Sequence, residues 1–419
     1  MASAPGIDDT RLLNYDKHIK GLRTPERLVP VAEMMTAETE RDIRTSLRQV
    51  LSKFPDQYWM RHDTDHEFAW DFYHAMAEAG WLGICTAEEY GGGGAGVQEA
   101  ALFIEEVAGN GGGLNAATMV QVALFGLEPV TKYGTDEQRR RFLPAAAAGE
   151  LQVCFGVTEP DAGTDTTSIT TFAEKVPGGY RVSGQKVFIS RAEQADRVLL
   201  ITRTSPRTDV AKPTQGMTLF LAPMDRERIK IQPIPKLGRN VVSTNFLFID
   251  DLFVPEEDRI GEEGQGFKYL LAGLNAERII VASVCLGIGR AALRRAVEYA
   301  KNRRVFGRQI GMNQGVQFPL ADSLAKLDAV ELLIRRAAWL YDSGQPCAKE
   351  ANEAKLLASE WGYEAADRAV QFHGGYGYTK EYHVERYWRD IRVLRIAPIA
   401  NELILAYLGE KVLGLPRSY

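Results

Sequence analysis

The feature that most limits how this chain can fold is a set of three long amphipathic segments in its last third. They span residues 267–304, 318–341 and 348–375, and each repeats apolar residues at three- and four-residue spacing. Helices of about 25 residues usually pack side by side, because none of them can bury its apolar stripe alone. We therefore predict an antiparallel four-helix bundle over residues 263–419.

The hydrophobic period differs in the two stretches before this bundle. Residues 36–150 keep the helical period, which predicts an all-α domain. Residues 151–262 instead contain short apolar runs separated by Pro, Gly, Asp and Asn, which predicts a small β-barrel-like domain. Its expected strands lie in GGYRVSGQKVFIS, ADRVLLITRT, GMTLFLAPM, IKIQPIPKLG and STNFLFIDDLFVP. The predicted class is α+β, with residues 1–35 as an N-terminal extension.

Composition excludes several classes of function. The formal net charge of −5 gives no basic footprint for nucleic acid, and no apolar run approaches the roughly 20 residues that cross a bilayer. The N-terminus lacks the apolar core of a secretory signal, so we expect a cytoplasmic protein. Four cysteines lie far apart without CxxC spacing, which argues against a metal site or a disulfide framework: Cys85, Cys154, Cys285 and Cys347.

Glycine-rich and turn-rich segments are the candidates for ligand contact. The segment CFGVTEPDAGTD, residues 154–165, follows an apolar run and places hydroxyls around Gly163, whose backbone a ligand can approach closely. On its own it is equally typical of an ordinary strand-to-loop turn. The runs EEYGGGGAG and GNGGG lack both the GK[ST] ending and the strand–GxGxxG–helix context, so they indicate connections rather than phosphate loops.

Four motifs, in this order, resemble those of the acyl-CoA dehydrogenase family. They are FGVTEPDAGTD, KVFIS at 186–190, RRVFGRQI at 303–310 with Gln314 beyond it, and QFHGGYGYTKEYHVERYWRD at 371–390. The resemblance extends over residues 34–419 and implies that family's fold: a helical domain, a β domain and a helical bundle. It also implies FAD as the cofactor, bound between the β domain and the bundle.

The resemblance assigns residues to the two ends of FAD. An isoalloxazine ring needs a flat apolar wall with a few polar contacts, and a diphosphate needs cationic or backbone donors. The implied flavin contacts are Phe155, Val157, Thr158, Gly163, Thr164, Phe188 and Ser190. The implied contacts to the diphosphate and nucleotide half, partly across a subunit interface, are Arg303, Phe306, Gln314, Gln371, Gly374 and Gly375. Taken singly, such residues could also be a surface arginine, a helix-capping glycine or a core phenylalanine.

The catalytic base departs from the commonest family pattern. That base lies eight residues after the Asp of an Arg-Asp pair, which here is Pro398, a residue with neither a carboxylate nor an N–H. Glu277 stands where isovaleryl- and long-chain acyl-CoA dehydrogenases carry their glutamate, although it could also be an ion-paired surface residue. Glu402 could serve only if the backbone shifted. Arg278 could orient Glu277 or hold the bundle together, and with Thr164 it is the candidate substrate contact.

The resemblance implies an activity, a partner and an assembly. The activity is α,β-dehydrogenation of an acyl-CoA thioester, in which a desolvated carboxylate takes the α-proton. The implied partner is an electron-transfer flavoprotein, and the implied assembly is a homodimer or homotetramer. Loss of the usual base at Pro398 leaves open a related flavoenzyme, either an acyl-CoA desulfinase or a flavin monooxygenase. A non-catalytic flavin-binding scaffold is a weaker alternative, since a scaffold needs no intact flavin motifs.

Overall fold

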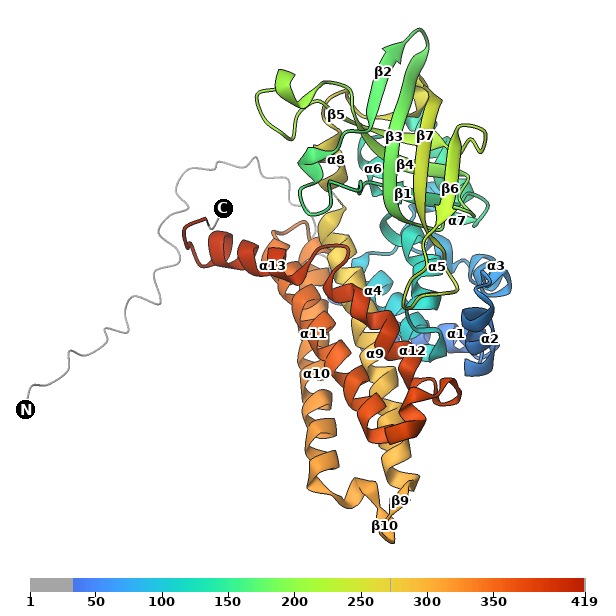
Figure 1. The fold of residues 1–419 in the computed structure, drawn as a ribbon, viewed down its shortest axis with the longest axis vertical. Coiled ribbons are helices and arrows are strands. Elements are labelled where there is room, and N and C mark those ends of the chain that lie inside the picture. Colours follow the sequence, from blue (N-terminus) through green and yellow to red (C-terminus); the bar gives the residue numbers. More distant parts are fainter. Residues whose placement is uncertain (1–32, 272, 418–419) are drawn as a thin grey trace, which may run out of the picture.

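The computed structural model describes residues 33–271 and 273–417, and it confirms the predicted three-part α+β fold (Figure 1). Residues 1–32 of the predicted N-terminal extension lie outside the described residues. The first part is helical, the second is a sheet, and the third contains the longest helices. The helices of the first part are α1 Ala37–Leu51, α2 Asp56–Asp65, α3 Trp70–Glu78, α4 Val97–Val107, α5 Gly113–Phe125, α6 Glu128–Tyr133 and α7 Asp136–Ala147.

Local chemistry sets where these helices begin and bend. Thr135 caps α7 through a reciprocal pair in which its hydroxyl accepts from the Gln138 N–H at 3.2 Å and its own N–H donates to the Gln138 side chain at 2.9 Å. A kink separates α4 from α5 at Gly111, whose φ of +95° suits glycine. A Cβ at Gly112 would lie 2.8 Å from Trp59, so the GNGGG run is needed for packing.

The second part is one mixed sheet whose central strands are buried on both faces. Its strands are β1 Val153–Gly156, β2 Phe172–Val176, β3 Gly179–Ser190, β4 Arg197–Arg203, β5 Met217–Pro223, β6 Ile229–Pro233, β7 Thr244–Pro255 and β8 Arg259–Ile260. The spatial order is β6-β7-β3-β2-β4-β5-β8, and β1 pairs in parallel with β4. Because β4 and β5 contribute to cores on both sides of the sheet, their apolar runs are continuous rather than alternating.

The third part is built on three long helices that lie side by side (Figure 1). Its helices are α8 Gly266–Leu271, α9 Leu274–Asn302, α10 Gln314–Asp342, α11 Ala348–His373, α12 Val384–Ile391 and α13 Asn401–Tyr407. A short hairpin of β9 Arg304–Val305 and β10 Arg308–Gln309 connects α9 to α10. Glycines let α9 approach α11 closely, since a Cβ at Gly289 would lie 3.0 Å from the Gly362 backbone.

The apolar character of α9 is explained by this packing. The helical stretch 266–302 is long and apolar enough, by length and composition, to cross a membrane, with a mean hydropathy of 1.6 in its most apolar window. The sequence expectation that no run comes close was therefore wrong for this stretch. Inside the fold 71% of that window is buried, against α4, α10 and α11. A core helix surrounded by other helices needs no polar face.

A buried ionic cluster ties the three parts together. Arg389 on α12 forms an ion pair with Asp63 on α2 and lies 3.6 Å from the Asp390 carboxylate. Asp390, only 1% exposed, accepts from the Arg239 N–H at 2.6 Å and from the Asn115 amide at 3.0 Å. Burial raises the pKa of Asp390 to about 6, and Arg389 opposes that rise. One cation therefore keeps two buried carboxylates ionised at the junction of all three parts.

Replacing Arg389 with Met is expected to destabilise the fold strongly, because Asp63 and Asp390 would lose their shared cation. Breaking a buried ion pair by removing one partner costs about 3–5 kcal/mol. Chemical denaturation at pH 7 measures the loss of unfolding free energy. The matched control is Arg48→Met, since Arg48 is 62% exposed in its pair with Glu106 and such pairs contribute about 0–1 kcal/mol. Equal losses for the two variants would contradict the role given to the cluster.

Candidate active site

Glu277 lies in the first turn of α9, where its N–H donates to the Gly273 carbonyl at 3.0 Å. Its side chain is half-buried, and within residues 33–271 and 273–417 its carboxylate has no hydrogen-bond partner. Burial raises the pKa of Glu277 to about 7, against the opposing charge of Arg278. A desolvated carboxylate with a pKa near neutrality has the properties of a general base. Arg278 donates to the Asn275 side chain at 2.9 Å, and among the described residues it acts on Glu277 through its charge rather than through a hydrogen bond.

The loop that carries Pro398, at the usual position of the base, is held in place by hydrogen bonds from a buried lysine. Pro398 is exposed and lies between the last turn after α12 and the start of α13. Lys355 on α11 donates to the Ile399 carbonyl at 2.6 Å and to the Asn401 side chain at 2.8 Å. Glu402, the other candidate base, is exposed on α13. Its exposure leaves it outside the desolvated surroundings that Glu277 has.

Helix α5 links the start of α9 to the strand that begins the first flavin motif. Phe125, at the end of α5, stacks on Phe155 of β1 with ring centroids 6.0 Å apart and an interplanar angle of 18°. The Phe125 carbonyl would lie 3.9 Å from a Cβ at Gly273, four residues before Glu277. One end of α5 therefore contacts both Phe155 and the backbone that carries Glu277.

The residues predicted to form the flavin wall gather at one end of the sheet. Thr158 accepts from the Val187 N–H at 2.9 Å, which joins the first motif to β3. Beyond it, Phe188 has a φ of +61° and is 64% exposed, at an irregularity in the pairing of β3 with β7. Phe155, Val157, Thr158 and Ser190 are half-buried around it, and Gly163 and Thr164 are exposed in the following turn. The structure therefore joins the first motif to β3 beside the exposed Phe188 and leaves Gly163 and Thr164 open in the following turn.

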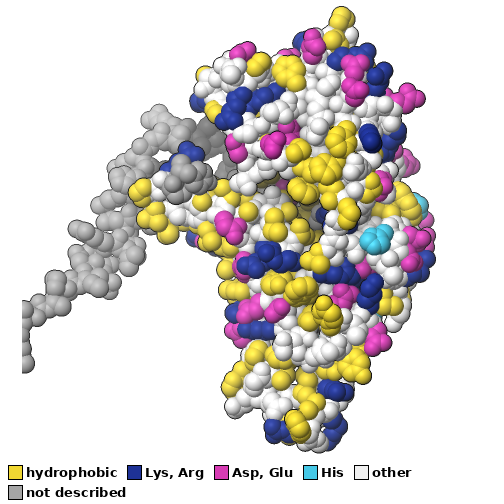
Figure 2. Space-filling model, in the orientation of Figure 1, with side chains coloured by type: hydrophobic (Ala, Val, Ile, Leu, Met, Phe, Trp, Pro, Cys, Tyr) yellow, Lys and Arg dark blue, Asp and Glu magenta, His cyan; other side chains and the backbone are white. Residues whose placement is uncertain are grey.

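The other predicted cofactor residues gather at the far end of the bundle. Arg303, Gln371, Gly374 and Gly375 line a cavity of about 470 Å³. Nothing lies within 4 Å of a Cβ built on Gly374 or Gly375, so the backbone there is open to a ligand. Phe306 is fully exposed at a φ of +50°, in the turn of the β9–β10 hairpin. Figure 2 shows apolar and basic side chains together at this end, and Gln314 at the start of α10 is also exposed.

Two groups of residues fit FAD chemically: the wall around Phe188 and the far cavity lined by Arg303. One chain does not bring these two groups together. The far cavity offers a guanidinium, an amide and open glycine backbone, which suit a diphosphate. The wall offers exposed apolar area, which suits a flat ring. At 1.5 Å per residue, α9 carries Arg303 about 39 Å away from Glu277. This exceeds the few bonds that join an isoalloxazine ring to its diphosphate, so both groups can serve one FAD only from different chains.

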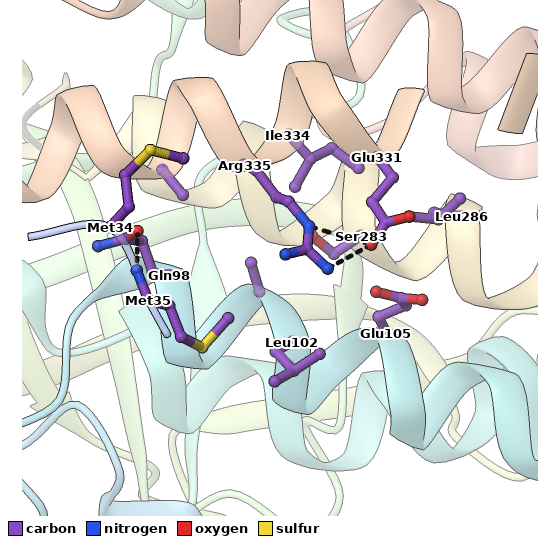
Figure 3. Close-up of a pocket in the computed structure, with 12 residues that line it drawn as sticks. Met34, Met35, Gln98, Leu102, Glu105, Ser283, Leu286, Glu331, Ile334 and Arg335 are labelled. Atoms are coloured by element: carbon purple, nitrogen blue, oxygen red, sulfur yellow. Dashed lines mark hydrogen bonds and ion pairs between the residues drawn. The ribbon is translucent and has the colours of Figure 1, made fainter. Parts of the chain in front are cut away.

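A second, smaller cavity is separate from this site. It has a volume of about 40 Å³ and lies between α4, α9 and α10 (Figure 3). Its lining is mainly apolar, with Met34 and Met35 at one end, Leu102 on α4 and Ile334 on α10. Arg335 at its edge forms ion pairs with Glu331 and Glu40. None of the predicted site residues lines it, so we attribute it to helix packing.

Two residues within the motifs have a place in the site that the sequence pattern did not reveal. Lys186 lies in KVFIS and Glu159 lies in FGVTEPDAGTD, and the structure joins them in a buried ion pair at 2.9 Å. The signal was present in the alternation of β3, where Lys186 occupies an inward position between apolar residues. Arg191 was missed in the same way, and it donates to the Met119 carbonyl of α5 at 2.8 Å.

The fold and the site together define a class of three-domain flavin-binding proteins: a helical domain, a β domain and a helical bundle. Comparisons with known proteins identify the family. Family models described as the N-terminal, middle and C-terminal domains of acyl-CoA dehydrogenase match residues 37–150, 154–252 and 264–413. Acyl-CoA dehydrogenase FadE12 of Mycobacterium tuberculosis is 38% identical over 386 residues, which cover 91% of this chain and 98% of that protein. The chain belongs to the acyl-CoA dehydrogenase family, a family of FAD-dependent oxidoreductases.

Other relatives broaden this picture. The CarC subunit of the caffeyl-CoA reductase–Etf complex of Acetobacterium woodii is 35% identical over 331 residues, covering 79% of this chain and 86% of that protein. The solved structure of butyryl-CoA dehydrogenase from Megasphaera elsdenii superimposes with a TM-score of 0.85 at 30% identity, covering 91% of this chain and all of that one. A structure described as an electron transferring flavoprotein of Acidaminococcus fermentans matches with a TM-score of 0.85 at 31% identity, covering 91% of this chain and all of that one.

Proposed function

We propose that this protein catalyses α,β-dehydrogenation of an acyl-CoA thioester, with FAD as cofactor and Glu277 as the base. The observation that carries the proposal is the desolvated carboxylate of Glu277, whose helix contacts the same end of α5 as Phe155. When bound, FAD supplies a hydride acceptor for the β-hydrogen. Glu277 removes the α-proton, and the apolar surface around Phe155 and Phe188 excludes water from the reacting carbons.

The residues around Glu277 determine how the proton is handled. Lys355 fixes the loop that carries Pro398, so this loop is held in place but offers neither a base nor an N–H at that position. Arg278 lies beside Glu277 and limits the rise of its pKa, so that the carboxylate form is populated near neutrality. We propose Arg278 and Thr164 as substrate contacts, on the strength of the family motif alone.

We propose a homodimer or homotetramer as the working assembly, in the cytoplasm, with an electron-transfer flavoprotein as electron acceptor. The separation of the wall from Arg303 by the length of α9 supports a flavin site completed by a second chain. The exposed Phe306, at a left-handed backbone conformation in a hairpin, suits insertion into a partner. The electron acceptor is supported by the relatives whose names include an electron-transfer flavoprotein.

The test of this function is anaerobic mixing of the purified flavoprotein with a series of acyl-CoAs of different length and branching. Bleaching of the oxidised flavin absorbance by at least one of them is the expected result. Oxygen consumption by the reduced flavin without bleaching by any acyl-CoA would instead support the monooxygenase alternative. Release of sulfite from an acyl-CoA that carries a sulfinic acid group would support the desulfinase alternative.

The rate of flavin reduction is expected to rise with pH through about 7. Glu277 acts as a base only when it is deprotonated, and burial raises its pKa to about 7. Below that pH the carboxyl is mostly protonated and the rate falls about tenfold per pH unit. Stopped-flow measurement of flavin bleaching between pH 5 and 9 gives the profile. A flat profile, with substrate saturating at every pH, would contradict the assignment.

A further inference from the structure

The interior of the β domain contains a lysine that is fully buried. Lys186 of β3 is 0% exposed, and its ammonium group donates to the Val157 carbonyl at 3.0 Å and to the Glu159 carboxylate at 2.9 Å. Burial lowers the pKa of Lys186 to about 8, while Glu159 favours its charged form. Lysines are almost never buried completely unless they are paired. The ammonium group thus joins β3 to the segment that follows β1.

Glu159 is bound from several directions. Its carboxylate accepts from the Thr170 N–H at 2.6 Å, the Thr170 hydroxyl at 2.9 Å and the Thr171 N–H at 3.0 Å, in addition to Lys186. It is 4% exposed. Replacing a buried ion pair with apolar residues is often neutral or stabilising, so stability alone does not explain why such a pair is present. The contacts indicate that the Lys186–Glu159 pair fixes the backbone geometry of the segments it joins.

The part of β3 that this pair adjoins is a strained bulge, which lies two residues beyond Lys186 at Phe188. The pairing of β3 with β7 shifts between Lys186 and Ile189, and Phe188 within the shift has a φ of +61°. A non-glycine residue in this conformation costs about 1–3 kcal/mol and persists only where its surroundings hold it. Lys186 holds one side of the bulge, and the Asn245 amide donates to the Ile189 carbonyl at 3.0 Å on the other. The result is an aromatic ring that stays 64% exposed.

We propose that the Lys186–Glu159 pair is the positioning device of the flavin wall. It holds Val157 and Thr158 against the strained bulge that presents Phe188, and so sets the affinity for FAD and the environment of its ring. Lys186 acts through the Val157 carbonyl and is a positioning residue. The inference rests on the proposed function only in that these wall residues contact the flavin.

The experiment compares two variants with a matched control in the full-length protein. Lys186→Met removes the ammonium group and leaves Glu159 buried without its cation. The double variant Lys186→Met with Glu159→Gln also removes that unpaired charge. The single carbonyl oxygen of Gln can still accept from Thr170, while the contact with Thr171 on the other side is lost. The control is Lys175→Met on β2, since Lys175 is 61% exposed in its ion pairs. The measurements are the unfolding temperature of the apoprotein, the dissociation constant for FAD and the absorption spectrum of the bound flavin.

We expect Lys186→Met to lower the unfolding temperature and to weaken FAD binding by about tenfold or more. We expect the double variant to recover part of the unfolding temperature lost by Lys186→Met, and yet to keep the weak FAD binding and a shifted flavin spectrum. Lys175→Met should match the parent in all three measurements. A double variant that binds FAD as tightly as the parent would overturn the inference. Failure of the proposed function has a different signature, namely that the parent binds FAD but no acyl-CoA reduces it.

Discussion

Replacing Glu277 with Gln is expected to slow reduction of the flavin by an acyl-CoA by about 10²–10⁴-fold, or to abolish it, while FAD stays bound. The amide keeps the size of the side chain but cannot accept the α-proton. Because Glu277 has no hydrogen-bond partner among the described residues, its replacement should leave the surrounding packing and the unfolding temperature unchanged. Single-turnover bleaching under anaerobic conditions measures the loss, and the flavin-to-protein ratio checks occupancy.

Glu402→Gln is the matched control for this result. Glu402 is the alternative candidate for the base. It lies four residues after Pro398 and is exposed on α13. Its replacement should leave the rate of flavin reduction within about twofold of the parent, since solvated surface groups contribute little. Normal reduction in the Glu277 variant combined with loss in the Glu402 variant would reverse the assignment of the base.

Replacing Arg303 with Ala is expected to weaken FAD binding by about 10- to 100-fold, the effect of removing a charge-assisted hydrogen bond. Arg303 is the cation that lines the far cavity, where Gln371, Gly374 and Gly375 supply only neutral groups. Equilibrium dialysis or quenching of free-flavin fluorescence measures the dissociation constant. Arg304→Ala is the control, because Arg304 is the neighbouring exposed cation and bonds back to the Gly307 carbonyl at 2.8 Å within its own hairpin.

The same variant tests whether two chains build one flavin site. A chain carrying Arg303→Ala keeps an intact wall and base, and a chain carrying Glu277→Gln keeps an intact far cavity. If the two groups come from different chains, a mixed dimer has one complete site out of two. We expect such heterodimers, purified with two different tags, to regain about half of the parent activity. Absence of any recovery in verified heterodimers would show that one chain supplies the whole site.

Much of the fold could be predicted because its long elements have one dominant period. The repeat in residues 267–304, 318–341 and 348–375 gave α9, α10 and α11, and the predicted strands correspond to β3 through β7. Other features depend on tertiary contacts. The apolar run of α9 is explained only by the helices around it, and beside the kink at Gly111 only the structure shows that Trp59 leaves no room for a Cβ at Gly112.

The candidate site was harder to predict, because sequence motifs carry no distances. Glu277 could be named from its motif, but its raised pKa depends on burial that only packing creates. The motifs containing Phe188 and Arg303 were expected to meet around one cofactor, partly across a subunit interface, but only the structure gives the length of α9 that lies between Glu277 and Arg303. Lys186 was overlooked because a lysine is normally assigned to the surface, and only its partners Val157 and Glu159 reveal its place inside.

Helix α9 has a further consequence for how this chain can vary. Its 29 residues join the turn that carries Glu277 to Arg303, which lines the far cavity, without an intervening hinge. Inserting one residue would turn everything beyond it by about 100° and advance it by about 1.5 Å. The number of residues in α9 therefore sets both the distance between Glu277 and Arg303 and the rotation of one relative to the other around the helix axis. Length changes should instead accumulate in exposed turns such as residues 204–216, where they alter neither quantity.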